Sequence, residues 1–94
     1  MLFLSPSVRQ KLLTRNLTEA HLVQCFASRT HGFLVDDREE HRTDPPTMWF
    51  IAQTDYGIVL KICCVFDGGV IHVKTAYTPN PHVIDMYYRI APLL

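Results

Sequence analysis

The stretch TMWFIAQTDYGIVLKICCVFDGGVIHVKTAY, residues 47–77, decides the fold of this chain. It contains three runs rich in β-branched and aromatic residues, at 47–54, 58–66 and 70–77, and the gaps between them are Asp-Tyr-Gly and Asp-Gly-Gly. Runs of this composition separated by glycine-containing turns are typical of β-hairpins. The stretch therefore predicts three antiparallel strands joined as a meander.

The turn at Gly68-Gly69 predicts which side chains share a face of the sheet. A two-residue loop pairs residue 67 with residue 70, and the pairing continues outward one residue at a time. On this register one face is almost wholly apolar and carries Leu60, Ile62, Cys64, Phe66, Ile71, Val73, Thr75 and Tyr77. The opposite face, which we call the lysine face, carries Lys61, Cys63, Val65, His72, Lys74 and Ala76.

The first turn decides where the 47–54 run points its side chains. A three-residue loop at 55–57 has its glycine in the left-handed conformation and adds Thr47, Trp49 and Ile51 to the lysine face. A two-residue loop would turn these side chains to the other face. With the three-residue loop, helices cover the apolar face, and the lysine face is an open surface with cations and an exposed tryptophan.

The residues before the meander predict two short helices. Ser5 is a plausible N-cap, Pro6 follows at the first helical position, and apolar spacing continues to about Arg15. Asn16 can cap a second helix that has Glu19 at its N3 position, and this helix has a wide apolar stripe. The two helices are expected to cover the apolar face of the sheet.

The remaining segments complete the expected layout. Residues 33–35 suit a short edge strand, and the polar run 36–46 ends in a double proline that favours an exposed loop. Apolar residues at helical spacing over 83–90 predict a final helix that Pro92 stops. The expected fold class is α+β, a single domain over 1–94. It has two N-terminal helices, a three- to four-stranded antiparallel sheet and a C-terminal helix.

Composition restricts the class of protein. The chain has 94 residues, 48% hydrophobic and 19% charged, which is too apolar for disorder and suits one small domain. A formal net charge of zero excludes the overall basic surface of a nucleic-acid coat protein but allows a local basic site. Three cysteines make no disulfide framework, and no apolar run reaches the roughly 18–20 residues of a membrane span. We therefore expect a cytoplasmic protein without membrane contact.

The lysine face has the groups that RNA cleavage by an internal 2′-hydroxyl needs. The cations Lys61 and Lys74 can stabilise the charge of a pentavalent phosphorane, and His72 can move a proton. Trp49 can stack an unpaired base, and Tyr77 near the rim can orient the 2′-hydroxyl. This chemistry requires no metal ion and no cofactor. Lysines on the outer side of a strand are also ordinary, so a merely solvated face is the competing interpretation.

The acidic loop supplies a second candidate. Its run DDREEHRTD, residues 36–44, suits a carboxylate metal site, a histidine base held by a neighbouring acid, or a solvated loop. His41 is its only group that titrates near neutrality, which makes it a secondary acid or base candidate. His21 and Cys25 have a spacing that can hold a metal, but no second such pair stands at a matching distance. The sequence therefore predicts no metal site.

The order of elements resembles the BrnT-type toxins of the wider RelE-like ribonuclease group. The similar phrases are LTEA (17–20), CF (25–26), WFIA (49–52), GIVLK (57–61) and IHVKTAY (71–77), which a tyrosine-bearing helix follows. This resemblance implies a sheet face that cleaves RNA with basic residues on the strands and C-terminal segment, and a cognate antitoxin that blocks it. Where that pattern ends its strand in arginine this chain has Tyr77, and its final helix retains Arg89.

A set of short bacterial proteins is also similar, through DRE (37–39) with His41, TDPPT (43–47) with WF (49–50), and KTAY (74–77) with PN (79–80). Such proteins often carry the label ADP-ribosyl-(dinitrogen reductase) hydrolase. Those hydrolases resemble large all-helical proteins with a two-magnesium carboxylate cluster. A chain of 94 residues with three strand-like runs cannot supply that scaffold.

These observations lead to one expected function and two alternatives. The expected function is a toxin-type, metal-independent endoribonuclease of a toxin–antitoxin pair, with Thr47, Asn80 and Arg89 as further RNA-binding candidates beside Trp49. The first alternative is a protein-interaction module or homodimer that docks through Trp49, Ile51, Val59 and Val65. The second is a protein that processes ADP-ribose or another nucleotide and binds the pyrophosphate with the same lysines.

Overall fold

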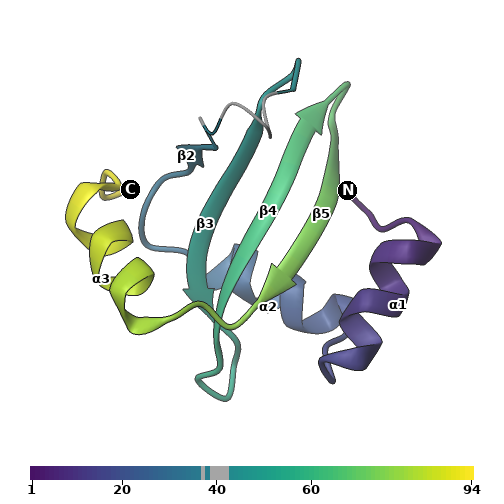
Figure 1. Cartoon of the computed structure of the whole chain (residues 1–94), viewed down its shortest axis with the longest axis horizontal. Coiled ribbons are helices and arrows are strands. Elements are labelled where there is room, and N and C mark those ends of the chain that lie inside the picture. The colour runs from purple at the N-terminus through teal and green to yellow at the C-terminus, as the bar shows by residue number, and fades with distance from the viewer. Residues whose placement is uncertain (37, 39–42) are drawn as a thin grey trace.

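The computed structural model describes residues 1–36, 38 and 43–94, and this part of the chain forms three helices and five strands (Figure 1). Their order is β1 (Leu2–Phe3), α1 (Pro6–Thr14), α2 (Glu19–Ser28), β2 (Leu34–Val35), β3 (Thr47–Gln53), β4 (Val59–Asp67), β5 (Val70–Tyr77) and α3 (Pro81–Ile90). The expected α+β class is confirmed, with two N-terminal helices, a sheet and a C-terminal helix.

All five strands form one mixed sheet in the order β1-β5-β4-β3-β2. The meander of β3, β4 and β5 is antiparallel as predicted, and β2 is the expected edge strand, with Leu34 opposite Trp49. The sheet is larger than expected because β1 adds to the other edge, in parallel, with Leu2 opposite Ile71. A two-residue strand is too short to show alternation, so no sequence pattern marks it.

The β3–β4 hairpin has the register that a three-residue loop predicts. Ile51 lies opposite Lys61, and Thr54 donates its N–H to the carbonyl of Ile58 at 2.9 Å, which closes the loop. Gly57 has φ +83°, a conformation that glycine adopts at little cost. The side chains of Thr47, Trp49 and Ile51 therefore share the lysine face with Lys61, as expected.

The β4–β5 hairpin keeps its predicted register only near the turn. Asp67 pairs with Val70 and Cys64 with Val73, as a two-residue Gly68-Gly69 loop requires. The register then shifts between Cys63 and Cys64, and Lys74 is left as the extra residue of a β-bulge. Beyond the bulge the observed pairs are Cys63 with Thr75, Ile62 with Ala76, and Lys61 with Tyr77.

The bulge corrects the predicted faces of β5. Because one extra residue reverses the alternation beyond it, Thr75 and Tyr77 belong to the lysine face and Ala76 belongs to the core. Ala76 is fully buried, and Tyr77 is partly accessible. The predicted assignment of these three side chains was wrong, and the correction places Tyr77 directly opposite Lys61.

The core lies between the sheet and the two N-terminal helices. α1 packs against β5 and α2 against β3, with α2 passing behind the strands in Figure 1. Phe50 of β3 is fully buried, and its ring centroid lies 4.7 Å from that of Phe26 on α2. Leu12 and Leu22 are buried from the helix side, and a fully buried leucine contributes about 1.5–3 kcal/mol to folding.

The helix ends differ in one respect from the expectation. The side chain of Ser5 accepts from the N–H of Val8 at 3.3 Å, which confirms the first N-cap. Asn16 does not cap α2. It has φ +58° in the turn after α1, a conformation that asparagine tolerates better than most residues. Thr18 is the N-cap instead, and His21 at N3 accepts the Thr18 N–H on Nδ1 at 3.0 Å.

The third helix covers part of the lysine face, which was expected to be open. α3 lies beside β3 in Figure 1, and the Tyr87 ring centroid is 5.5 Å from that of Trp49. Trp49 is only 8% exposed and Ile51 is fully buried, so the predicted exposed tryptophan was wrong. Tyr87 anchors the helix because it is fully buried and donates its hydroxyl to the Gly32 carbonyl at 2.9 Å.

Candidate functional site

Two cations alternate with two aromatic rings across the lysine face. The Nζ atom of Lys61 lies 4.3 Å from the centroid of the Trp49 ring and 5.8 Å from that of Tyr77. The Arg15 guanidinium carbon lies 5.9 Å from the centroid of the same Tyr77 ring. We call Trp49, Lys61, Tyr77 and Arg15 the cation–aromatic row. All three distances fall within the range of cation–π contacts.

The row depends on the two hairpins together. The regular β3–β4 register sets Trp49 diagonal to Lys61, since Trp49 faces Cys63, two residues along β4. The bulge at Lys74 sets Tyr77 opposite Lys61 on the other neighbouring strand. Lys61 therefore stands between one ring from each hairpin, and both its position and its neighbours follow from the sheet.

Arg15 reaches the row from the end of α1, and sequence reasoning missed it. Its Nη1 donates to the Thr75 hydroxyl at 3.1 Å and to the Ala76 carbonyl at 2.9 Å. These bonds hold the guanidinium at the edge of β5 beyond the residues that pair with β1. The contact joins residues about sixty positions apart, so local spacing gives no signal for it.

The structure does not bring His72 beside Lys61. His72 lies opposite Val65, four residues along β4 from Lys61, which corresponds to about 13 Å. Its ring lies 5.6 Å from that of Phe3 on β1. Lys74 is exposed at the bulge. Of the predicted catalytic residues, Lys61 and Tyr77 are therefore together, whereas His72 is remote, and His41 lies outside the described residues.

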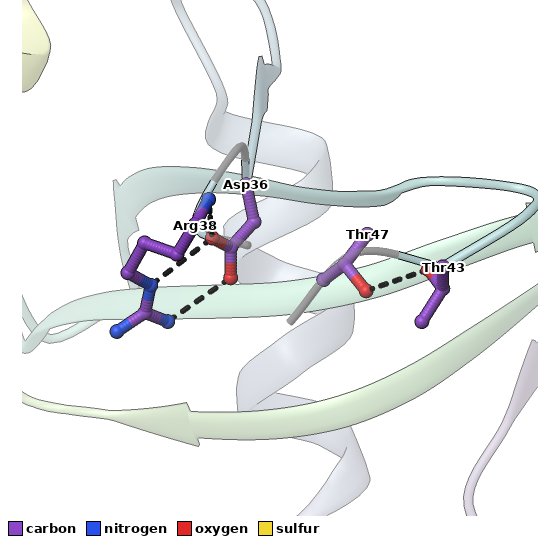
Figure 2. A network of polar contacts seen from close by, with 4 residues as sticks. All are labelled: Asp36, Arg38, Thr43 and Thr47. Atoms are coloured by element: carbon purple, nitrogen blue, oxygen red, sulfur yellow. Dashed lines mark hydrogen bonds and ion pairs between the residues drawn. The ribbon is translucent and has the colours of Figure 1, made fainter. Parts of the chain in front are cut away.

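Three predicted binding residues have local structural partners. The hydroxyl of Thr47, a residue only 8% exposed, lies 3.2 Å from that of Thr43, as Figure 2 shows. Asn80 is the N-cap of α3, and its side chain accepts from the Val83 N–H at 3.0 Å. Arg89 forms an exposed ion pair with Asp85 at 3.1 Å, one turn earlier on α3. None of these contacts places the three residues in the cation–aromatic row.

A cleft of about 500 Å³ opens next to Lys61, between α3 and the strands β2 and β3. Its walls are mainly apolar, and the charged residues among the described residues that line it are Lys61, Asp36 and Arg38. The Arg38 side chain donates two hydrogen bonds to the Asp36 carboxylate, from Nε to Oδ1 at 3.1 Å and from Nη2 to Oδ2 at 3.0 Å (Figure 2). This bidentate pair compensates the Asp36 carboxylate at the cleft wall.

The cysteines do not offer an activated nucleophile. Burial raises the pKa of Cys25 to about 11 and, together with neighbouring Cys63, that of Cys64 to about 12. Burial also raises the pKa of Cys63, and the nearby Lys61 ammonium offsets only part of this rise. All three are free thiols that stay protonated at neutral pH. Within the described residues, no three His, Cys, Asp or Glu side chains gather as a metal site.

Comparisons with models of protein families, with curated proteins and with solved structures find no match to this chain. Of the helices that the structure describes, none is long and apolar enough to cross a membrane.

Proposed function

We propose that this chain is a cytoplasmic, toxin-type endoribonuclease that cleaves single-stranded RNA without a metal ion. The observation that carries the proposal is the position of the Lys61 ammonium between the Trp49 and Tyr77 rings, with Arg15 also close to the Tyr77 ring. Cations interleaved with aromatic rings are the usual means of binding a single strand, because they engage phosphates and bases together.

In the proposed complex, Lys61 and Arg15 bind the sugar–phosphate backbone next to Tyr77. Both cations lie within 6 Å of the Tyr77 ring centroid, so a strand that contacts both passes close to this side chain. Trp49 has little accessible surface left for stacking, and its role is to hold the Lys61 ammonium by a cation–π contact. Lys74 on the exposed bulge extends the basic surface along β5.

The proposed reaction is an internal transesterification. The 2′-oxygen forms a bond to phosphorus, the bond from phosphorus to the 5′-oxygen breaks, and the products are a 2′,3′-cyclic phosphate and a 5′-hydroxyl. The proton of the 2′-hydroxyl passes to solvent water, and the departing 5′-oxygen takes a proton from solvent water. Lys61 stabilises the charge of the phosphorane, and the Tyr77 hydroxyl orients the 2′-hydroxyl. His72 is too distant from Lys61 to serve the same phosphate.

The structure favours this proposal over the apolar docking alternative. That alternative used Trp49, Ile51, Val59 and Val65 as an open surface, but Trp49 and Val65 are each 8% exposed and Ile51 is fully buried. The chain itself therefore covers three of the four side chains. We retain a cognate antitoxin as the proposed partner, and we expect it to cover the cation–aromatic row.

Growth after induced expression, with and without the adjacent gene, tests the proposal. We expect growth arrest with fragmented total RNA, and relief of both by the neighbouring gene product. The double variant Lys61→Ala, Lys74→Ala should lose the arrest. Lys11→Ala, which removes an exposed lysine on α1, is the matched control and should keep it. Arrest that persists in the double variant, or growth with intact RNA in the wild type, contradicts the proposal.

A further inference from the structure

The cleft beside α3 has the form of a small-molecule site. Its apolar walls come from two sides: Val83, Met86 and Ile90 on α3, and Leu34, Val35 and Trp49 on β2 and β3. Its volume of about 500 Å³ lies within the roughly 300–1,000 Å³ of ligand pockets. The three α3 residues stand at i, i+3 and i+7, so one stripe of the helix forms a continuous wall.

Among the described residues that line the cleft, the two cations Lys61 and Arg38 stand against one carboxylate, that of Asp36. Asp36 and Arg38 compensate each other through their bidentate pair. Lys61 has no carboxylate within ion-pair distance among the residues that the structure describes, and its neighbours there are the Trp49 and Tyr77 rings. An ammonium group beside apolar walls favours a ligand with an anionic group.

We infer that the cleft between α3 and the β2–β3 strands binds a small amphipathic acid, whose apolar body lies against Met86 and Ile90 and whose anionic group pairs with Lys61. Val35 and Ile90 at the cleft wall are 52% and 58% exposed, so an apolar body that fills the cleft removes their surface from water. This inference goes beyond the proposed function, and its test uses no RNA.

The dimensions of the cleft favour a small molecule over a protein partner. Nine of the described residues line it, whereas a stable protein interface uses about 20–30 residues on each side. Among the described lining residues, the Lys61 ammonium can pair with one anionic head group. A carboxylate and a phosphate monoester share this chemistry, and parallel titrations with decanoate and decyl phosphate distinguish them.

The fluorescence of Trp49 reports on the cleft directly. Trp49 is the only tryptophan of the chain and forms part of the wall. We expect decanoate or decyl phosphate to give a saturable change in its emission. Decanol, which has the same apolar body and no charge, should bind at least tenfold more weakly. Equal responses to decanoate, decyl phosphate and decanol, or no saturable response to either anion, would overturn the inference.

Two variants locate the anionic group and the apolar body. Lys61→Met should weaken decanoate binding about tenfold or more and leave decanol unchanged, whereas Lys74→Met, at an exposed lysine outside the cleft, should leave both unchanged. Ile90→Asp places a negative charge at an exposed wall position, where little packing is lost, and should abolish decanoate binding. If Lys74→Met weakens binding as much as Lys61→Met, or if Ile90→Asp has no effect, the ligand does not occupy this cleft.

Discussion

The two hairpins of the central meander share strand β4 but differ in regularity. The β3–β4 hairpin is paired without interruption from Thr47 opposite Val65 to Gln53 opposite Val59. The β4–β5 hairpin starts from an ideal two-residue turn, and a bulge at Lys74 then shifts its register. A turn therefore fixes the register only as far as the first irregularity, and here the irregular hairpin creates the contact between Lys61 and Tyr77.

The largest expected effect is on the free energy of unfolding, and it compares a buried residue of the β3–β4 hairpin with a partly exposed residue near the β4–β5 turn. Phe50→Ala should lower the free energy of unfolding by about 3–5 kcal/mol, because Phe50 is fully buried and its ring packs against Phe26 and Phe33. Phe66→Ala, at a residue 37% exposed whose ring lies 4.9 Å from that of Phe33, should cost less, about 1–2 kcal/mol. Chemical denaturation measures both, and equal losses would contradict the assigned core.

The next effect concerns the loop of the regular hairpin. Gly57→Ala should cost about 1–2 kcal/mol, since Gly57 has φ +83° and a Cβ atom there meets no other atom within 4 Å. The cost is therefore conformational and not steric. Gly57→Asn is the matched control and should cost less, because asparagine tolerates a left-handed backbone. Thermal denaturation of the two variants should rank them in this order, and the reverse order contradicts the loop assignment.

The smallest expected effect on stability is that of deleting Lys74, which tests whether this residue is the extra residue of the bulge. Deletion of Lys74 removes the extra residue and leaves Cys63 with Thr75, Ile62 with Ala76 and Lys61 with Tyr77 as a regular ladder. We expect a change in stability below about 1 kcal/mol, because no core side chain changes face.

Nuclear Overhauser contacts between the Lys61 ε-methylene and the Tyr77 ring should persist in the deletion variant. Loss of these contacts, or a destabilisation as large as that of Phe50→Ala, would show that the register beyond Cys63 is not the one described.

The predicted parts of the fold have strong local causes. Ser5 before Pro6, the glycines of both turns and the proline after the last helix each act within a few residues, and each was identified correctly. The bulge had no such cause, because the run from Val70 to Tyr77 carries no glycine or other mark at Lys74. A regular alternation of side chains along the whole of β5 therefore predicts the wrong face for Tyr77.

The candidate site was only partly predictable, because local sequence patterns do not show contacts between distant parts of the chain. Lys61 and Trp49 were placed on one face because the regular hairpin sets them there. Arg15 joins the row through hydrogen bonds to a strand edge about sixty residues away, which no local pattern shows. The partial cover over Trp49 comes from the docking of α3, which depends on the buried Tyr87 hydroxyl bond to Gly32.

Cleavage of a single-stranded RNA by the purified chain in the presence of EDTA is the most direct test of the central claim. The account predicts fragments that end in a 2′,3′-cyclic phosphate, at least tenfold slower cleavage by Lys61→Ala and Tyr77→Phe, and an unchanged rate for Lys11→Ala. Cleavage that requires a divalent metal ion, or that proceeds equally well in Lys61→Ala, would contradict it.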